Sequence, residues 1–205
     1  MEVYYNENDP FCCAWLARLM EAGLIPRGVI DGRDIREVKA EDVRGYRVCH
    51  WFAGIGGWPF ALQLAGFDPT RSVWTASCPC QPFSSAGKRK GQADERHLWP
   101  VLAALVRQCP VELCLGEQVG SRAGYEWLDG VRSDLEAEGY TFGAADLPAC
   151  CAGAPHIRNR LFWVAVADGA GRAQPDLHLF KRRPRQTVPG AGRTLLRHTL
   201  SHACH

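Results

Sequence analysis

Two cysteines separated by one proline stand in a short polar segment that could supply a nucleophile. Residues 77–84 read Ser-Cys-Pro-Cys-Gln-Pro-Phe-Ser and follow the β-rich run 72–76. The next segment, 85–91, has little apolar content and carries three positive charges. Nearby cations favour the charged form of a thiol, and the thiolate is its nucleophilic form. We therefore take Cys80 as the candidate nucleophile.

A carboxyl group and two guanidinium groups occur near the ends of later predicted strands. Glu117 follows the candidate strand 111–115, in what we predict to be a turn. Arg158 and Arg160 open the last β-rich run, and strand alternation would point both to the same side. We expect Glu117 at the same edge of a sheet as Cys80.

A glycine-rich segment, Phe52-Ala-Gly-Ile-Gly-Gly57, directly follows the β-rich run 47–51. Glycines let the backbone approach a ligand closely, and the start of the following helix offers free N–H groups. By itself the segment suits a nucleotide site, an S-adenosylmethionine site or a tight turn without ligand. A nicotinamide oxidoreductase built on this turn would leave the segments around Cys80 and Glu117 unexplained.

The elements that must position these groups alternate between β-rich runs and amphipathic stretches. The candidate strands are residues 3–5, 47–52, 72–76, 111–115, 140–147 and 161–166. The candidate helices are residues 10–23, 57–66, 96–108 and 124–138. This alternation predicts an α/β fold with an open, mostly parallel sheet and helices on both faces. Ligands of such sheets bind at the carboxyl ends of the strands, where the candidate residues fall.

Length and composition exclude several classes of protein. The chain has 205 residues, of which 46% are apolar and ten are cysteines, enough for one well-buried domain with a small appendage. No apolar run approaches the roughly 18 to 20 residues of a membrane span, and the first residues do not resemble a signal peptide. We expect a cytoplasmic protein with reduced thiols. Because no C-x-x-C spacing occurs, we predict no metal site.

Charge divides the chain near Asp168. From Gly169 onward there are seven Lys and Arg against one acidic residue, a net charge of +6. Residues 1–168 carry 17 basic and 21 acidic groups, a net charge of −4. Prolines and glycines with weak periodicity follow the boundary. We predict a catalytic domain over 1–168 and a basic, poorly ordered tail over 169–205.

Four strings of residues, 52–57, 79–84, 117–119 and 158–160, occur together in one order. Their order and approximate spacing resemble the DNA cytosine-5 methyltransferase family, including its phage and prophage members. The string Pro-Cys-Gln-Pro-Phe-Ser is highly specific, and the matches together span about residues 47–166. The resemblance implies a Rossmann-like fold, a methyltransferase activity that depends on S-adenosyl-L-methionine, and double-stranded DNA as the partner.

One unit of that family stands in a different place in this chain. Only residues 67–77 separate the end of the helix after the glycine-rich segment from Cys78, too few for two strands and a crossover helix. The missing unit resembles residues 1–46, where an Asn-Glu7-Asn8 end of a strand, a helix and an Asp34-Ile35 pair follow one another. Residues 36–46 could form the return crossover. We therefore expect a circularly permuted domain.

The resemblance also assigns roles to individual residues. Cys80 would add to a flipped-out cytosine, and Glu117 would bind its ring nitrogen and amino group. Arg160 would hold the carbonyl oxygen, while Arg158 would support the thiolate. The implied cofactor-binding residues are Glu7, Asn8, Asp34, Ile35, Phe52, Ala53, Gly54, Ile55, Gly56, Gly57 and Pro79. The implied DNA-binding residues are Gln81, Ser84, Ser85, Lys88, Arg89 and Lys90.

The chain departs from the family pattern in ways that leave a second function open. Gln118 stands where the family usually has asparagine, His156 replaces a glutamine, and His50 replaces an acidic residue. Residues 167–205 are too few for the family's target-recognition domain. The alternative is therefore a truncated, catalytically weak subunit that binds DNA or cofactor and needs a specificity partner or self-association. RNA cytosine also stays open as a substrate, as does a nucleoid-associated or phage-encoded origin in a bacterial host.

Overall fold

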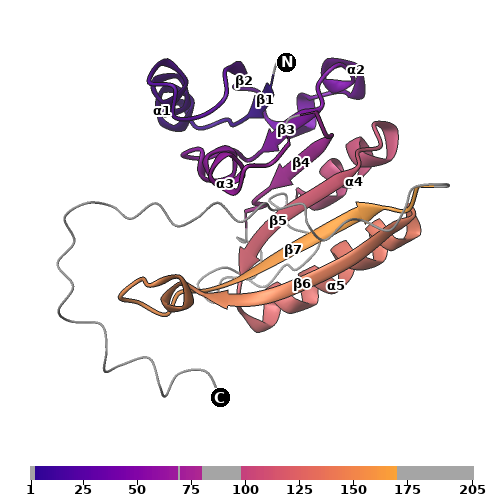
Figure 1. The fold of residues 1–205 in the computed structure, drawn as a ribbon. Helices are drawn as coiled ribbons and strands as arrows, with labels where there is room; N and C mark the ends of the chain where they lie inside the picture. The colour runs from indigo at the N-terminus through magenta and orange to yellow at the C-terminus, as the bar shows by residue number, and fades with distance from the viewer. Residues whose placement is uncertain (1–2, 69, 80–97, 170–205) are drawn as a thin grey trace.

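A seven-stranded sheet organises the residues that the computed structural model describes, which are 3–68, 70–79 and 98–169 (Figure 1). The strands are β1 (Val3–Asn6), β2 (Gly28–Asp31), β3 (Val48–Trp51), β4 (Val73–Ala76), β5 (Leu113–Val119), β6 (Tyr140–Pro148) and β7 (Asn159–Ala167). The helices are α1 (Pro10–Glu21), α2 (Ala40–Val43), α3 (Gly57–Ala65), α4 (Trp99–Gln108) and α5 (Arg122–Ala137). Single 3-10 turns occur at η1 (Ile35–Glu37) and η4 (Ala149–Ala152).

The sheet has the strand order β2-β1-β3-β4-β5-β7-β6. The first five of these strands are parallel to one another, and β7 runs antiparallel to both β5 and β6. The predicted α/β class and mostly parallel sheet are therefore confirmed. Strand β2 was missed, because its four residues show no β-rich run long enough to stand out from the turn after α1.

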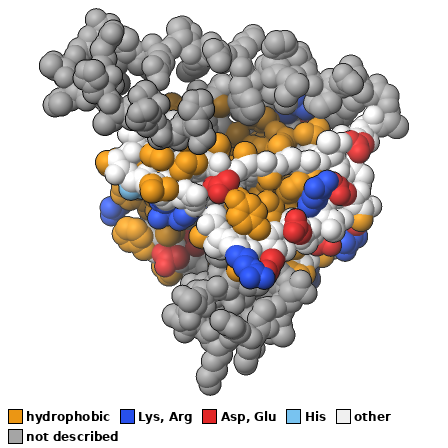
Figure 2. Space-filling model, turned by 90° about the horizontal axis from the view of Figure 1, so that it is seen from below, with side chains coloured by type: hydrophobic (Ala, Val, Ile, Leu, Met, Phe, Trp, Pro, Cys, Tyr) orange, Lys and Arg blue, Asp and Glu red, His pale blue; other side chains and the backbone are white. Residues whose placement is uncertain are grey.

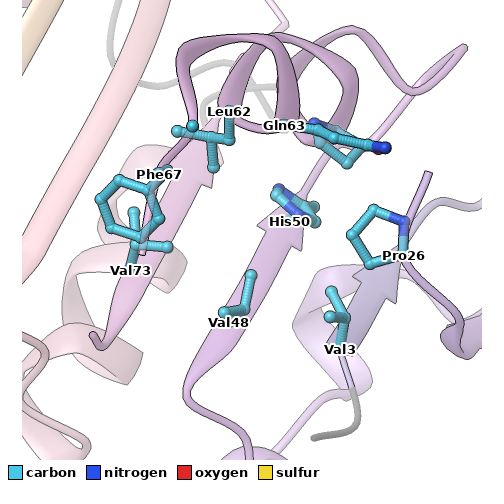
Figure 3. Close-up of a pocket in the computed structure, with 10 residues that line it drawn as sticks. Val3, Pro26, Val48, His50, Leu62, Gln63, Phe67 and Val73 are labelled. Carbon is cyan, nitrogen blue, oxygen red and sulfur yellow. The ribbon is translucent and has the colours of Figure 1, made fainter. Parts of the chain in front are cut away.

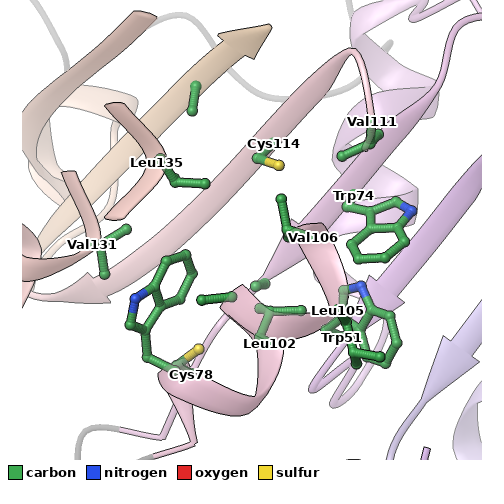
Figure 4. Packing of buried hydrophobic residues seen from close by; sticks show 14 of the residues in the cluster. Trp51, Trp74, Cys78, Leu102, Leu105, Val106, Val111, Cys114, Val131 and Leu135 are labelled. Carbon is green, nitrogen blue, oxygen red and sulfur yellow. The ribbon is translucent and has the colours of Figure 1, made fainter. Parts of the chain in front are cut away.

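Helices cover both faces of the sheet, as predicted. One core cluster joins alternate residues of the strands to α4 and α5, and it includes Trp51, Trp74 and Cys114 (Figure 4). The other cluster joins the opposite residues of the strands to α1 and α3, with Leu16 and Leu62 among its members. Each large apolar side chain buried in this way contributes on the order of 1.5 to 3 kcal/mol. The two helical layers thus bury both faces of the sheet and leave its carboxyl edge between them.

The first unit of the chain forms the β2 edge of the sheet. Strand β1 pairs in parallel with β2 on one side and with β3 on the other. The chain returns from β2 to β3 through η1 and α2, so the segment 36–46 does supply a short helical crossover. The end of β1 therefore lies beside the glycine-rich turn that follows β3, although 45 or more residues separate them in sequence.

His50, in the middle of the sheet, is fully buried and held neutral. Its Nδ1 lies 2.7 Å from Thr75 Oγ1 on β4. Burial lowers the pKa of the imidazole to about 3. The ring also lines a largely apolar cavity of about 400 Å³ between α3 and the sheet (Figure 3). Because the first residues of β1, β3 and β4 line it as well, this cavity opens toward the amino ends of the strands, away from the candidate site.

The surface of the described residues carries mixed charge. On the face seen in Figure 2, acidic and basic side chains are interspersed with hydrophobic ones.

The residues predicted to bind DNA lie outside the described residues, as do Cys80 and the tail from residue 170 onward; they are Gln81, Ser84, Ser85, Lys88, Arg89 and Lys90. Within the described ranges, no helix combines the length and apolar character needed to cross a membrane.

Candidate active site

A small cavity at the carboxyl ends of β1, β2 and β3 brings together residues from distant parts of the chain. Its volume is about 110 Å³. Six of the predicted cofactor-binding residues line it: Glu7, Asn8, Asp34, Ile35, Phe52 and Pro79. Asn6, Arg33 and Leu98 complete the lining and were not named as site residues; Asn6 and Arg33 stand directly before Glu7 and Asp34, whereas Leu98 belongs to no recognisable motif. The structure therefore places the end of β1, the loop after β2 and the glycine-rich turn around one space.

Glu7 joins the N-terminal unit to the glycine-rich turn. Its Oε2 accepts a 2.7 Å hydrogen bond from the Gly54 N–H, and its Oε1 accepts a 2.9 Å bond from the Asp9 N–H. The backbone N–H of Ala53 donates to the carbonyl of Asn6 at 3.0 Å. A carboxylate oxygen has two lone pairs, so Glu7 retains acceptor capacity for further hydroxyl donors.

The turn itself needs backbone conformations that most residues avoid. Phe52 and Gly54 have φ angles of 54° and 52°, and Gly56 has a φ of 81°. A Cβ at Gly56 would also come within 3.1 Å of Leu19 Cδ1 on α1, a tight contact that adds to the conformational preference for glycine. Ile55, by contrast, is exposed. Of the predicted segment 52–57, only Phe52 lines the cavity.

Asp34 is placed at the cavity but is engaged by a neighbour. Its Oδ2 accepts from Arg36 Nη2 at 2.7 Å, and its Oδ1 accepts the backbone N–H of Arg36 at 2.9 Å. These bonds hold the pKa of the Asp34 carboxyl low, at about 2. The amide of Asn6 donates to the carbonyls of Asp31 and Arg33, at 3.3 and 2.9 Å, and so holds the loop that carries Asp34 against β1.

Glu117 and Arg160 form an ion pair on adjacent strands of the same edge. Arg160 Nε lies 2.7 Å from Glu117 Oε1, and the two side chains are only 20% and 25% exposed. Burial raises the pKa of Glu117, while Arg160 and then Arg158 act in the opposite direction. Burial thus favours the protonated form of Glu117, while the two arginines favour the carboxylate.

Two predictions about these residues were wrong in detail. Glu117 lies within β5 rather than in a turn after it, because β7 continues the ladder to Val119 and pairs Glu117 with Phe162. Arg158 does not continue the alternation of β7, which begins at Asn159. Its φ of 40° lies in the left-handed region, where strand alternation does not apply. Strand alternation therefore does not set the direction of Arg158, although both arginines act on the Glu117 carboxyl, as a placement on one side requires.

Gln118 fixes the segment that leads to Cys80. The side chain is 2% exposed, and its Nε2 donates to the carbonyl of Cys78 at 3.3 Å. Its Oε1 accepts the N–H of Val119 at 2.9 Å. The glutamine that departs from the family pattern thus ties the end of β5 to the residue two places before Cys80.

Cys78 itself is part of the hydrophobic core. It is 6% exposed and lies among the residues of the α4 and α5 cluster (Figure 4). Burial raises the pKa of its thiol well above the ordinary range. A thiol of this kind stays protonated, so Cys78 is unsuited to act as the nucleophile.

Comparison with known proteins gives a consistent result. A family model described as C-5 cytosine-specific DNA methylase matches residues 69–188, more than half of the chain. The type II methyltransferase M.AluI of Cellulosimicrobium cellulans is 33% identical over 117 residues, 51% of this chain and 22% of its own length. M.HhaI of Haemophilus parahaemolyticus is 26% identical over 167 residues, 62% of this chain and 51% of its own length. The chain thus spans about half or less of these curated relatives.

Among solved structures, the fold is similar to that of a DNA modification methyltransferase encoded within a prophage (E. coli). The TM-score is 0.52 at 18% identity, over 81% of this chain and 40% of the other. This likeness concerns the fold, and it agrees with the Rossmann-like sheet described above. The extent of the family match decides the assignment: the chain belongs to the C-5 cytosine-specific DNA methylase family.

Proposed function

We propose that the chain is a DNA cytosine-5 methyltransferase that transfers a methyl group from S-adenosyl-L-methionine to carbon 5 of cytosine in double-stranded DNA. The observation that carries the proposal is the Glu117–Arg160 pair, partly buried at the carboxyl edge of the sheet. Glu117 lies on β5, the strand next to β4. The chain continues from β4 into the segment that contains Cys80. Chemistry on a pyrimidine ring requires a weak acid, a cation and a nucleophile, and Cys80 follows in sequence from the adjacent strand.

The residues around the small cavity fit the cofactor. Glu7 offers carboxylate acceptors for the two ribose hydroxyls, and Asp34 offers an acceptor for the adenine amino group if it exchanges part of its contact with Arg36. Phe52, Ile35 and Leu98 supply apolar surface for a flat purine. When bound there, S-adenosyl-L-methionine would supply an electrophilic methyl group, and its sulfonium sulfur would keep the electron pair of the broken carbon–sulfur bond as a neutral thioether.

Cys80 begins the proposed reaction. Carbon 5 of cytosine is a poor nucleophile, so the Cys80 thiolate first adds to carbon 6 and forms a carbon–sulfur bond. The electron pair displaced from the ring double bond makes carbon 5 nucleophilic. After carbon 5 is methylated, its proton leaves to a base, through water in our proposal. The returning electron pair then expels the thiolate.

Glu117 and the two arginines stabilise the ring during the addition. A protonated Glu117 donates a hydrogen bond to ring nitrogen 3 and accepts one from the exocyclic amine. Arg160, which already orients Glu117, holds the carbonyl oxygen of the base. Arg158 stabilises the negative charge of the Cys80 thiolate. The β5–β7 pairing fixes the backbone of Glu117 and Arg160 beforehand, so these two groups need little reorganisation during the reaction.

Access to carbon 6 requires the base to leave the DNA stack. A stacked cytosine cannot be reached by a thiolate, so the nucleotide must be flipped into the site. We assign this clamping role to residues 84–91, with Gln81, Ser84 and Ser85 near the base and Lys88, Arg89 and Lys90 at phosphates. The basic tail adds contacts with the backbone of the DNA that do not depend on its sequence.

The full-length chain should form a covalent complex with DNA that contains 5-fluorocytosine when cofactor is present. Fluorine cannot leave as a proton does, so the Cys80 adduct persists and can be seen as a shifted band under denaturing conditions. Bisulfite sequencing of plasmid from expressing cells then gives the sequence context. Omission of the cofactor and a parallel RNA oligonucleotide serve as controls. No adduct with either substrate would favour the alternative of a catalytically weak subunit.

We further propose that residues 1–168 form the catalytic domain and that 1–46 is the cofactor-binding unit moved ahead of the glycine-rich turn. The support is the neighbour order β2-β1-β3 and the bond from the Gly54 N–H to Glu7. In this arrangement Glu7 stands at the end of the strand beside the turn, although it precedes the turn in sequence.

The substitution Glu7→Gln is expected to weaken the affinity for S-adenosyl-L-methionine by about 10-fold or more, since hydrogen bonds to a charged group contribute roughly 1.5 to 3 kcal/mol. Isothermal titration calorimetry measures the affinity directly. Glu21→Gln, at the exposed end of α1, is the matched control and should bind like the wild type. If Glu7→Gln binds S-adenosyl-L-methionine as tightly as the wild type does, the proposal that residues 1–46 form the cofactor-binding unit is contradicted.

A further inference from the structure

Trp58 bridges three elements whose ends meet at the candidate site. It lies in the first turn of α3, just after the glycine-rich turn. Its indole Nε1 donates a 3.0 Å hydrogen bond to Ser77 Oγ, beyond the end of β4. Its ring meets Phe162 of β7 edge to face, with ring centroids 6.2 Å apart and an interplanar angle of 79°. One side chain thus contacts the segments on both sides of the site.

The contact with Ser77 holds the backbone from which Cys80 follows. Ser77 comes directly after the last residue of β4, and Cys78 comes next. The Cys78 carbonyl accepts from Gln118 of β5, so two consecutive residues are held by side chains from two different elements, α3 and β5. Ser77 and Cys78, the residues that lead to Cys80, are therefore held in position relative to both α3 and β5.

The contact with Phe162 reaches the catalytic strand pair. Phe162 pairs with Glu117 across the β5–β7 ladder, and it lies two residues from Arg160, on the same face of β7. Trp58 therefore packs against the strand position opposite the carboxyl group that forms the ion pair with Arg160. Phe162 is 37% exposed, so this aromatic contact lies at the border of the site rather than in the core.

We infer that Trp58 is a positioning residue that sets the distance between the cofactor turn, the segment leading to Cys80 and the Glu117–Arg160 pair. The inference rests on the proposed function. A thiolate must reach carbon 6 while the methyl donor stands over carbon 5, and an error of about 1 Å in such an arrangement can cost roughly 100-fold in rate. A phenylalanine would keep the ring packing but would lose the hydrogen bond to Ser77.

The test uses Trp58→Phe, Ser77→Ala and the double variant of the full chain. In single-turnover reactions with cofactor and 5-fluorocytosine DNA, each single variant should form the adduct about 10-fold more slowly. The double variant should be no slower than either, because one hydrogen bond is removed in all three. Affinity for cofactor and for DNA should change less than about 2-fold, which separates positioning from binding.

Trp99→Phe is the matched control. The Trp99 Nε1 donates to Asp134 Oδ2 at 2.7 Å, so this control removes an indole hydrogen bond between α4 and α5, here to a carboxylate rather than a hydroxyl. This control should lower the melting temperature but leave the adduct rate unchanged. An adduct rate like that of the wild type in Trp58→Phe, or a loss explained wholly by weaker cofactor binding, would overturn the positioning role alone. No adduct with the wild-type chain would overturn the proposed function, and this role with it.

Discussion

Replacing Cys80 by alanine is expected to abolish methyl transfer and adduct formation, with a loss on the order of 10⁴-fold or more. Removing the nucleophile of a covalent mechanism has effects of this size, because the remaining groups cannot activate the ring. Methylation is measured with radiolabelled cofactor and double-stranded DNA, and the adduct is measured with 5-fluorocytosine DNA. Affinity for the cofactor should stay near that of the wild type, since the cavity residues are unchanged.

Cys78→Ala provides the matched control for this substitution. The two cysteines flank the same proline, but Cys78 is buried in the core with a raised thiol pKa. Its loss should lower stability by about 1 kcal/mol through the space left in the core, and the remaining activity should be substantial. An adduct that survives in Cys80→Ala and vanishes in Cys78→Ala would reverse the assignment.

Substitution of Glu117 is expected to have the second largest effect. Glu117→Ala should reduce the rate of adduct formation by about 10² to 10³-fold, the range for removing one preorganised group that stabilises developing charge. The substitution also leaves Arg160 without its carboxylate partner. Single-turnover kinetics measure the step directly. Glu112→Gln is the control, since Glu112 pairs with Arg71 at the opposite end of β5, with 3.3 Å between Arg71 Nε and Glu112 Oε2.

The same residue should contribute to the pH dependence of the reaction. The protonated form of Glu117 is the donor to ring nitrogen 3, and it is present below its pKa. Because burial raises that pKa, the useful range extends upward, and the rate should fall as pH rises through it. Glu117→Gln cannot titrate, so its profile should lack this limb. If the rate of Glu117→Gln falls with rising pH in the same way as that of the wild type, another group is responsible for the titration.

The sequence allowed most of the architecture to be predicted, because the elements that carry a strong local pattern could be recognised. The strands β1, β3, β4, β6 and β7 and the helices α1, α3, α4 and α5 were expected within a few residues of their bounds. Strand β2 was missed, since four residues of a short edge strand carry little periodic signal. The end of β5 was placed too early, because its last residues are held in the strand by pairing with β7.

The sequence alone determined the family strings, the order of the elements and the residue types available for chemistry. These depend on local composition and spacing. Only the tertiary structure decided that Glu7 contacts the Gly54 N–H, that Glu117 pairs with Arg160, and that Trp58 reaches Ser77. Each of these contacts joins residues 19 or more positions apart. They depend on the lateral order of the strands and on how the helices pack across them, which no local pattern encodes.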